Sequence, residues 1–331
     1  MGVKLQGLAS PRKINVNDLS GRVIAIDAFN WIYQFLTTIR LADGSPLSDK
    51  NGKVTSHLNG IFYRSMNLLS ANVVPWFIFD GSYPKFKQNT NLERQKAKEH
   101  AAKLAEEAET EEERAMYLKR TVKVDDYIIS SSKELLSLLG IPIYQAPAEG
   151  EAQAAGLNKD NIAYAVASQD YDTILFGGER IVRNLSITNK KKLAGKGVTV
   201  TVSPEMIESR NIFSSLNINR EQLITLALLI GTDYNSGVKG IGPKKGLALV
   251  KKDPVEKILK SYDFDAEYPI SEIFEYFMNP VVDKVSEKPV IKSVSKDKLI
   301  GFMCDDHSFG SDRILSYLEK INKSDNLLTD Y

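Results

Sequence analysis

Three short apolar segments give the clearest pattern along the chain, because each of them ends at acidic residues. They read "RVIAIDAFN" (22–30), "VVPWFIFDG" (73–81) and "AYAVASQDYD" (163–172). Unbroken apolar runs of this length are typical of strands that are buried on both faces, as in parallel sheets. Each segment therefore predicts a buried strand.

Helix-like patterns separate these segments, including 58–69 and 130–139. Strands that alternate with helices predict an α/β fold, with a mixed, mainly parallel central sheet flanked by helices. In such sheets functional groups gather at the carboxyl ends of the strands. A single aspartate there is usually a turn or a helix cap, but three strands ending this way indicate a shared acidic site. Its members would be Asp27, Asp80, Asp170 and Asp172.

Two more carboxylates stand in "APAEGEAQAA" (146–155), where Glu149 and Glu151 are two residues apart. Pro147 favours a helix that begins here, and at a helix start both side chains can turn toward one point. The alternative is that they only complement the helix dipole. Asp233, in the glycine-containing turn "GTDYN", is expected to join them.

Seven converging carboxylates would repel one another strongly, so the pattern predicts cations between them. Neither Cys nor His lies nearby, which favours a hard ion, Mg²⁺ with Mn²⁺ as a substitute, over zinc. Two such ions about 4 Å apart activate a water molecule and stabilise the leaving oxygen of a phosphodiester. The single cysteine, Cys304, excludes a CxxC zinc motif and an internal disulfide.

The segment "GVKGIGPKK" (237–245) follows the apolar helix pattern 221–230 and leads into a second helix. Its glycines, with Lys244 and Lys245 beside them, predict a tight hairpin whose backbone N–H groups bind a phosphate. A generic turn is the alternative. The spacing between two apolar helices favours a helix-hairpin-helix that binds the DNA backbone through Gly240 and Gly242.

Residues 85–123 differ from the rest, because they mix Lys, Arg and Glu and hold few large apolar side chains. This composition predicts a solvated helical segment that stands off the globule. Overall charge does not point to nucleic acid or away from it, since 43 basic residues face 42 acidic ones. No apolar run is long enough to span a bilayer, and no secretion signal opens the chain, so an intracellular protein is expected.

The same patterns suggest five parts of the chain. They are an N-terminal region (1–98), a charged helical linker (99–129), an internal region with the helix-hairpin-helix (130–256), a C-terminal helical region (257–322) and a tail (323–331).

Over nearly its whole length the chain closely resembles the archaeal and eukaryotic flap endonucleases, which are structure-specific 5′ nucleases of replication and repair. The resemblance rests on "AEGEAQAA", "QDYD" and "GTDYNSGVKGIGPKK" in that order, and on "VIAIDAFNWIYQFL" and "FIFDGSYPKFK" before them. It implies a 5′ flap endonuclease with 5′-3′ exonuclease activity that acts on branched DNA.

The resemblance also implies roles for single residues. Lys87 and Arg94 would contact the scissile phosphate, Tyr33 would stack on a terminal base, and Gly2 would reach toward the DNA. The alternatives are solvated charges on a helix and a core tyrosine. One part of the metal site would be Asp27, Asp80, Glu149 and Glu151, and the other Asp170, Asp172 and Asp233.

Three further properties follow from the resemblance: a monomer, a monovalent cation such as K⁺ at the glycine hairpin, and a C-terminal box for the sliding clamp (PCNA). In that box Leu327 and Tyr331 keep the apolar and final aromatic positions, while Ser324 and Asp330 replace the usual Gln and first aromatic. Weak clamp binding is therefore expected.

Other interpretations remain open at this level. A Holliday-junction or excision-repair nuclease of the same superfamily would share the acidic residues, but those enzymes carry large insertions that this chain lacks. A ribonuclease with a related acidic site would not need the helix-hairpin-helix. A non-catalytic DNA-binding scaffold would gain nothing from seven carboxylates facing a phosphate backbone.

Overall fold

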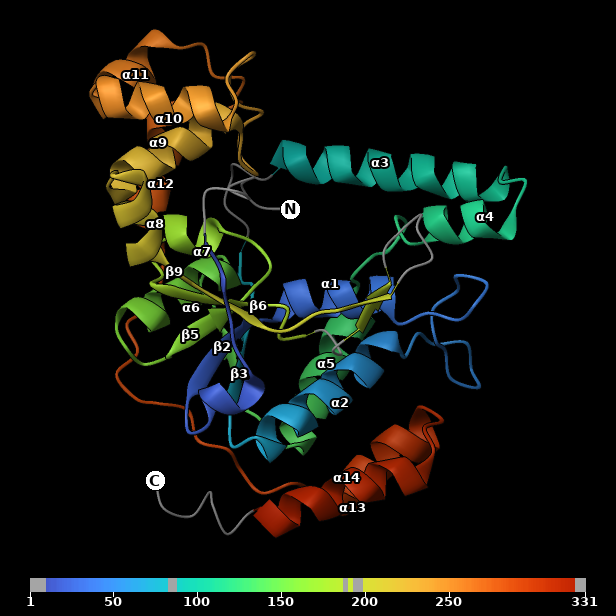
Figure 1. Ribbon diagram of the computed structural model, residues 1–331. Helices are drawn as coiled ribbons and strands as arrows, with labels where there is room; N and C mark the ends of the chain where they lie inside the picture. Colours follow the sequence, from blue (N-terminus) through green and yellow to red (C-terminus); the bar gives the residue numbers. More distant parts are fainter. Residues whose placement is uncertain (1–9, 83–87, 187–189, 193–198, 325–331) are drawn as a thin grey trace.

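A seven-stranded sheet forms the centre of the computed structural model, which describes residues 10–82, 88–186, 190–192 and 199–324 (Figure 1). The strand order is β1-β9-β6-β5-β2-β3-β4. Pairing is parallel from β6 through β5, β2 and β3 to β4, whereas β9 runs antiparallel to β6 and β1. The predicted mixed, mainly parallel sheet is thus confirmed. Its strands are β1 (Arg12–Lys13), β2 (Val23–Asp27), β3 (Val74–Phe79), β4 (Ile143–Gln145), β5 (Ala165–Ala167), β6 (Arg180–Arg183) and β9 (Glu205–Glu208).

The three predicted buried strands are β2, β3 and β5, and their side chains alternate between two faces. In β3, Phe77 packs into the core on one face, while Trp76 and Ile78 pack into a cluster on the other. In β2, Ile24 and Ala25 divide in the same way. Burial on both faces explains why these strands read as continuous apolar runs rather than as alternating ones.

Helices cover both faces of the sheet (Figure 1). The predicted helix 58–69 is part of α2, and the predicted helix 130–139 is part of α5, which begins earlier because the Asp125 side chain accepts a hydrogen bond from the Ile128 N–H at 2.9 Å. One face is covered by α1 (Ala28–Thr38), α2 (Ser56–Ser70) and α5 (Asp126–Leu138); α6 (Gly150–Lys159) and α7 (Asp172–Leu175) contribute to the core of the other.

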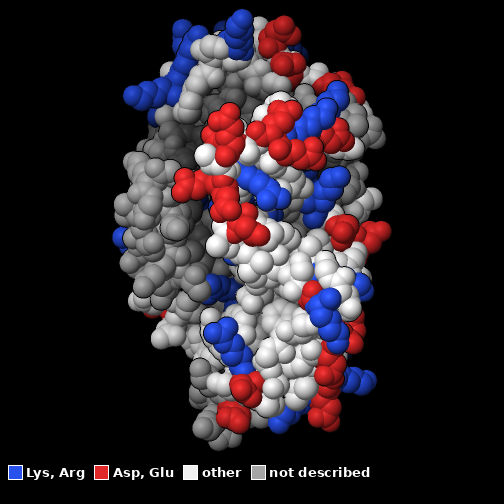
Figure 2. All heavy atoms as spheres, turned by 90° about the vertical axis from the view of Figure 1, so that its right-hand side faces the viewer, with Lys and Arg blue, Asp and Glu red and all other residues white. Residues whose placement is uncertain are grey.

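The charged segment is helical, as predicted, and forms α3 (Gln88–Glu106) and α4 (Glu111–Leu118), which pack against each other. Figure 1 shows this helical pair standing apart from the sheet. Figure 2 views that side of the molecule and shows acidic and basic side chains interleaved rather than separated. No residue of α4 is buried, so this helix lies at the surface rather than in the core.

The second half of the chain is mostly helical. The segment 279–295 is irregular. The next helix starts at Lys296, and the chain continues in π-helical geometry over Gly301–Asp306. The remaining elements are β7 (Lys190–Lys192), β8 (Thr199–Thr201), α8 (Ser209–Leu216), α9 (Arg220–Ile230), α10 (Pro243–Lys252), α11 (Val255–Ser261), α12 (Ile270–Met278), α13 (Lys296–Ile300) and α14 (Ser311–Ser324). Among the described residues, none of the helices has the length and apolarity to cross a membrane.

Candidate active site

Carboxylates gather at the carboxyl edge of the parallel strands because the chain turns into a helix or loop directly after each strand. Asp27 ends β2 and caps α1, where its Oδ1 accepts a hydrogen bond from the Asn30 N–H at 3.0 Å. The Asn30 side chain in turn donates to Asp170 Oδ2 at 3.1 Å. Asn30 thus links the acidic ends of β2 and β5, through its backbone N–H and its side-chain amide.

The two glutamates start α6 in different ways. Glu149 is the extended N-cap residue, whereas Glu151 lies within the first turn of the helix. The N-cap residue leaves the helical path, so residues two apart need not diverge at this point. The predicted helix start is confirmed.

Gly150, between the two glutamates, permits a close approach to Asp80. Its N–H donates to Asp80 Oδ1 at 2.7 Å. A Cβ at this position would stand 2.9 Å from Asp80 Oδ1 and 3.1 Å from the Ile78 carbonyl oxygen. Glycine in "AEGEA" is therefore required by packing against the end of β3, and the contact joins Asp80 to the glutamates.

Glu151 carries the largest electrostatic perturbation among the acids of the cluster. Burial raises the pKa of its carboxyl well above the usual range, and the charges of Asp172, Asp170 and Asp27 raise it further. Thr173 holds the same carboxylate through its N–H at 3.0 Å and its hydroxyl at 2.6 Å. Mutual repulsion of this kind is what the sequence pattern predicts for carboxylates that share one site.

The turn that contains Asp233 contacts the cluster through the neighbouring residue, Tyr234. This turn is closed by a bond from the Thr232 hydroxyl to Asn235 Oδ1 at 2.8 Å. The turn places the buried hydroxyl of Tyr234 2.7 Å from Glu149 Oε1, to which it donates. Burial, with the charge of Glu149 beside it, raises the pKa of Tyr234. Asp233 itself is half-buried next to this contact.

The donor chemistry of the cluster fits a hard divalent cation, because every predicted ligand is a carboxylate oxygen and Glu151 is buried among like charges. Within the described ranges, however, no three acidic, His or Cys side chains are arranged closely enough to form a metal-binding group. The carboxylates instead accept hydrogen bonds from Asn30, Gly150, Thr173 and Tyr234.

The predicted helix-hairpin-helix is present, with α9 and α10 packed against each other. Gly240 has a φ of +80°, and a Cβ on it or on Gly242 would meet no atom within 4 Å. Gly242 caps α10 and Pro243 occupies its first turn, so N–H groups at this helix start are available to a ligand. Lys244 and Lys245 are exposed beside it.

The other predicted residues divide into two groups. Tyr33, on α1, is 39% exposed and lies under the ammonium of Lys98, which is 6.0 Å from its ring centre. Tyr33 is therefore not a core residue. Arg94 lies on α3. Gly2, Lys87, Leu327 and Tyr331 lie outside the described residues.

Several residues of this site carry no obvious signal in the sequence. Asn30, Ser168 and Thr173 bind the carboxylates, and Tyr234 and Tyr276 lie against Glu149. Their proximity in sequence to Asp27, Asp170, Asp172 and Asp233 is the one feature that could have indicated the first four. Tyr276, on α12, is distant in sequence from every motif.

Comparison with known proteins agrees with this site. The XPG N-terminal domain matches residues 1–101, and the XPG I-region matches residues 140–233. The flap endonuclease 1 of Thermococcus onnurineus is 46% identical over 98% of this chain and 95% of its own. That of Pyrococcus furiosus is 45% identical over 98% of this chain and 96% of its own.

Solved structures show the same relationship. The flap endonuclease-1 from Methanococcus jannaschii is 38% identical, has a TM-score of 0.76, and matches 97% of this chain and 98% of its own. The catalytic core of Rad2, in complex with a DNA substrate, has a TM-score of 0.69 at 25% identity and covers 94% and 96%. With its acidic site at the carboxyl edge of the sheet, this chain belongs to the flap endonuclease family and is a DNA-hydrolysing nuclease.

Proposed function

We propose that the chain cleaves branched DNA at the base of 5′ single-stranded flaps, with an associated 5′-3′ exonuclease activity, in lagging-strand maturation and DNA repair. The observation that carries this proposal is the gathering of six acids from β2, β3, α6 and the end of β5 at one edge of the sheet, where Glu151 is buried among Asp27, Asp170 and Asp172. Similarity to relatives that are called flap endonuclease 1, over nearly the whole chain, supports the proposal.

Two Mg²⁺ ions, replaceable by Mn²⁺, are the proposed cofactors. When bound, they would supply an activated water and stabilise the leaving oxygen of the phosphodiester. The chain's own contribution is to position the carboxylates: Gly150 fixes Asp80, Tyr234 fixes Glu149, and Thr173 fixes Glu151. One part of the two-metal site would be formed by Asp27, Asp80, Glu149 and Glu151, and the other by Asp170, Asp172 and Asp233.

Positive side chains would complete the site. Lys87 and Arg94 are proposed to contact the scissile phosphate, where their charge stabilises the transition state. Tyr33 is proposed to stack on a terminal base, a role for which its exposure on α1 is suitable. Gly2 would approach the same DNA end.

The glycine hairpin is proposed to hold the duplex through Gly240, Gly242, Lys244 and Lys245, with a K⁺ ion between the backbone and a phosphate. Its support is the exposed helix start at Gly242 and the open space around both glycines. Backbone contacts of this kind set the position of the duplex and carry no base specificity.

Sliding-clamp (PCNA) binding is proposed through Leu327 and Tyr331, in a chain that acts as a monomer inside the cell. The contact would be weak, because one aromatic anchor and the glutamine are missing and interfaces draw most of their energy from a few such anchors.

A gel assay in Mg²⁺ tests the proposal by comparing a double-flap DNA, a plain duplex and a four-way junction. We expect cleavage at the flap base, slower release of nucleotides from the duplex 5′ end, and little action on the junction. Human GEN1, whose solved structure holds Holliday-junction DNA, shares only the fold at 21% identity and a TM-score of 0.65. Preferential cleavage of the junction would overturn the proposal in favour of that class.

A further inference from the structure

A second pocket lies at the opposite edge of the sheet, beneath the amino ends of β2, β3 and β5. It has a volume of about 890 Å³ and is lined by Val23, Val74, Ala163 and other residues around the strand starts. This volume falls within the range of ligand-binding pockets, which is about 300–1,000 Å³. The flap-cleavage site, at the carboxyl edge, does not use it.

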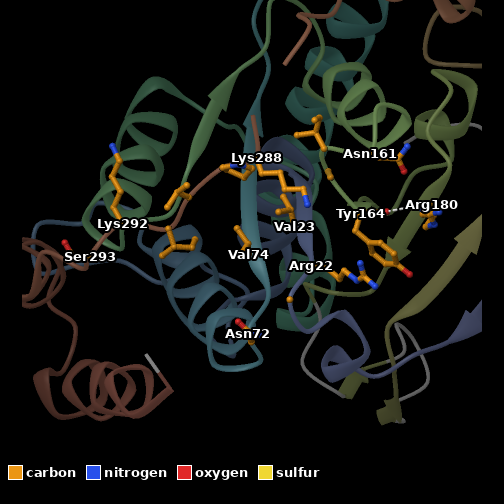
Figure 3. A pocket seen from close by; sticks show the side chains of 16 residues that line it. Arg22, Val23, Asn72, Val74, Asn161, Tyr164, Arg180, Lys288, Lys292 and Ser293 are labelled. Carbon is orange, nitrogen blue, oxygen red and sulfur yellow. Dashed lines mark hydrogen bonds between the residues drawn. The ribbon is translucent and has the colours of Figure 1, made fainter. Parts of the chain in front are cut away.

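The rim of this pocket is basic. Its lining contains Arg22, Arg180, Lys288 and Lys292 and no acidic residue. Arg180 has carboxylate neighbours outside the lining, at 3.7 Å (Glu179) and 3.9 Å (Glu208). Among the described residues, the other three cations form no ion pair. Figure 3 shows Arg22 and Arg180 beside Tyr164 on one side of the pocket and Lys292 on the other.

One wall of the pocket is formed by residues 288–292, the second half of a strap (283–292) that is fixed at its two ends. Asp283 exchanges two hydrogen bonds with the Gln153 side chain, at 2.7 and 3.0 Å, and the Lys292 N–H donates to the Gly140 carbonyl at 2.8 Å. Between these anchors, residues 284–291 form no backbone–backbone hydrogen bond within the described chain. The strap therefore offers backbone donors and acceptors that an added extended peptide can use.

The apolar part of the pocket is also left open by the described residues. Val290, on the strap, is 75% exposed, and it lines the same space as Ile162 and Ile291. An occupant with apolar side chains and several negative charges would complement both the walls and the rim.

The seven residues after α14 have this composition. They read "DNLLTDY" (325–331), with two leucines, a tyrosine, two aspartates and no basic residue. In extended form, seven residues reach up to about 25 Å.

The end of α14 faces the pocket side of the molecule. α14 packs on α2, where Tyr317 contacts the rings of Phe62 and Tyr63 at 6.1 and 5.2 Å. Figure 1 shows the two helices running in the same direction, and α2 leads directly to Asn72, which lines the pocket. The tail consequently starts near the pocket.

We propose that the C-terminal segment 325–331 docks in the basic, apolar pocket at the amino edge of the sheet. Its leucines would lie against the pocket walls, and its carboxylates beside Arg22, Lys288 and Lys292. Docking within one chain benefits from an effective concentration in the millimolar range. A contact with a dissociation constant of about 0.1 mM between separate molecules would then keep the pocket mostly filled.

The test measures binding of an N-terminally labelled peptide, residues 325–331, to the chain truncated after Ser324, by fluorescence anisotropy. We expect binding to the truncated chain and about tenfold weaker apparent binding to the full chain, where the attached tail competes. Arg22→Glu or Lys292→Glu in the truncated chain should weaken binding at least tenfold. Lys260→Glu, a charge reversal on exposed α11 outside the pocket, is the matched control and should leave binding unchanged.

Four results would overturn the proposal. Equal binding by the truncated and full chains would show that the tail does not occupy the pocket. Equal binding of a peptide with Leu327→Ser and Leu328→Ser would reveal a general anion site. Concentration-dependent dimers that vanish on truncation would place the tail in a second copy. An equal loss of peptide binding in Lys260→Glu would show that overall charge, rather than the pocket, causes the effect. Thermal melts of each variant show that it is folded.

Discussion

The two edges of the central sheet carry opposite charges. At the carboxyl edge, Glu151 is buried among aspartates, while at the amino edge Arg22 and Lys292 surround a pocket without an acidic residue. Both edges are built by the same strands. This difference shows that one sheet can carry two separate sites, here an acidic cluster and a basic pocket, because strand ends and strand starts lead into different loops.

The edges also differ in how strongly their charges are constrained. The carboxylates accept hydrogen bonds from named donors at 2.6 to 3.1 Å, whereas Arg22, Lys288 and Lys292 are exposed. Fixed charges in a partly buried site interact far more strongly than charges in water. Changes at the carboxyl edge should therefore affect chemistry, and changes at the amino edge should affect only weak association.

The largest effect is expected from Asp172→Ala. This change removes the buried charge of a proposed metal ligand, so the single-turnover rate on a flap DNA in Mg²⁺ should fall about a thousandfold or more, while flap binding stays normal or strengthens. Asp160→Ala is the matched control, since Asp160 is the exposed C-cap at the other end of α6. Cleavage by the Asp172 variant at more than a small fraction of the normal rate would exclude it as a ligand.

Lys87→Ala and Arg94→Ala should give the next largest effect. Each cation is proposed to act on charge that develops on the phosphate, so the chemical step should slow by about a hundredfold while the dissociation constant changes little. Lys96→Ala, an exposed lysine on the same helix α3, serves as control. A change in affinity alone, with single-turnover chemistry intact, would identify the two residues as solvated surface charges.

A buried histidine lets the helical layer be disturbed without touching either edge. His57, on α2, contacts the Ser131 hydroxyl at 2.8 Å, and burial lowers its pKa to about 3, with a smaller contribution from His307. The unfolded chain takes up a proton near pH 6.5 whereas the folded chain does not, so stability falls as the pH drops below that value. Between neutral pH and pH 5 the loss should be about 2 kcal/mol.

Urea unfolding at a series of pH values measures this loss. His57→Gln, which cannot titrate, should flatten the dependence over the same range, although it lowers stability at neutral pH. A slope that is identical in the two proteins would assign the acid sensitivity to other groups.

Gly240→Val should weaken duplex binding about tenfold and leave cleavage at saturating enzyme largely intact. The φ of Gly240 is +80°, which a β-branched residue adopts only with strain, and the added side chain would enter the open space where a phosphate is proposed. Gly52→Val is a close control, because Gly52 also has a φ of +80° and no atom within 4 Å. Equal binding losses in both variants would point to strain alone, and loss of cleavage at saturation would contradict the clamping role.

The carboxyl edge could be predicted from the sequence because its signals are local. Each acid directly follows an apolar strand, so Asp27 and Asp80 were expected at one edge before any contact was known. The two-residue spacing of Glu149 and Glu151 is explained by the start of α6, where Glu149 is the N-cap and Glu151 lies in the first turn. The alternation of strands with helices along the chain predicts the parallel sheet for the same reason, because it is also a local signal.

The amino edge could not be predicted in this way. Arg22, Tyr164 and Lys292 come from three distant segments, and none of them belongs to a motif. The ring of Tyr164 lies 4.8 Å from the Arg22 guanidinium and 5.0 Å from that of Arg180, a grouping that depends on tertiary packing alone. Tyr276 could not be predicted either, because α12 is distant in sequence from Glu149 and only the tertiary fold brings the two residues together.

The smallest effect on activity is expected from changes to the C-terminal tail, which is proposed both to bind the clamp and to dock at the amino edge. Removing residues 323–331 should leave flap cleavage unchanged without a clamp and abolish stimulation by the organism's own clamp, because Leu327 and Tyr331 are the proposed anchors. Binding should be weak, since one aromatic anchor and the glutamine are missing. If the tail also docks at the amino edge, Arg22→Glu should strengthen clamp binding severalfold by releasing it. Calorimetry of the clamp with the full chain, the truncated chain and the Arg22 variant measures both effects. Clamp stimulation that survives truncation would assign the contact to another surface, and unchanged affinity in the Arg22 variant would separate the pocket from clamp binding.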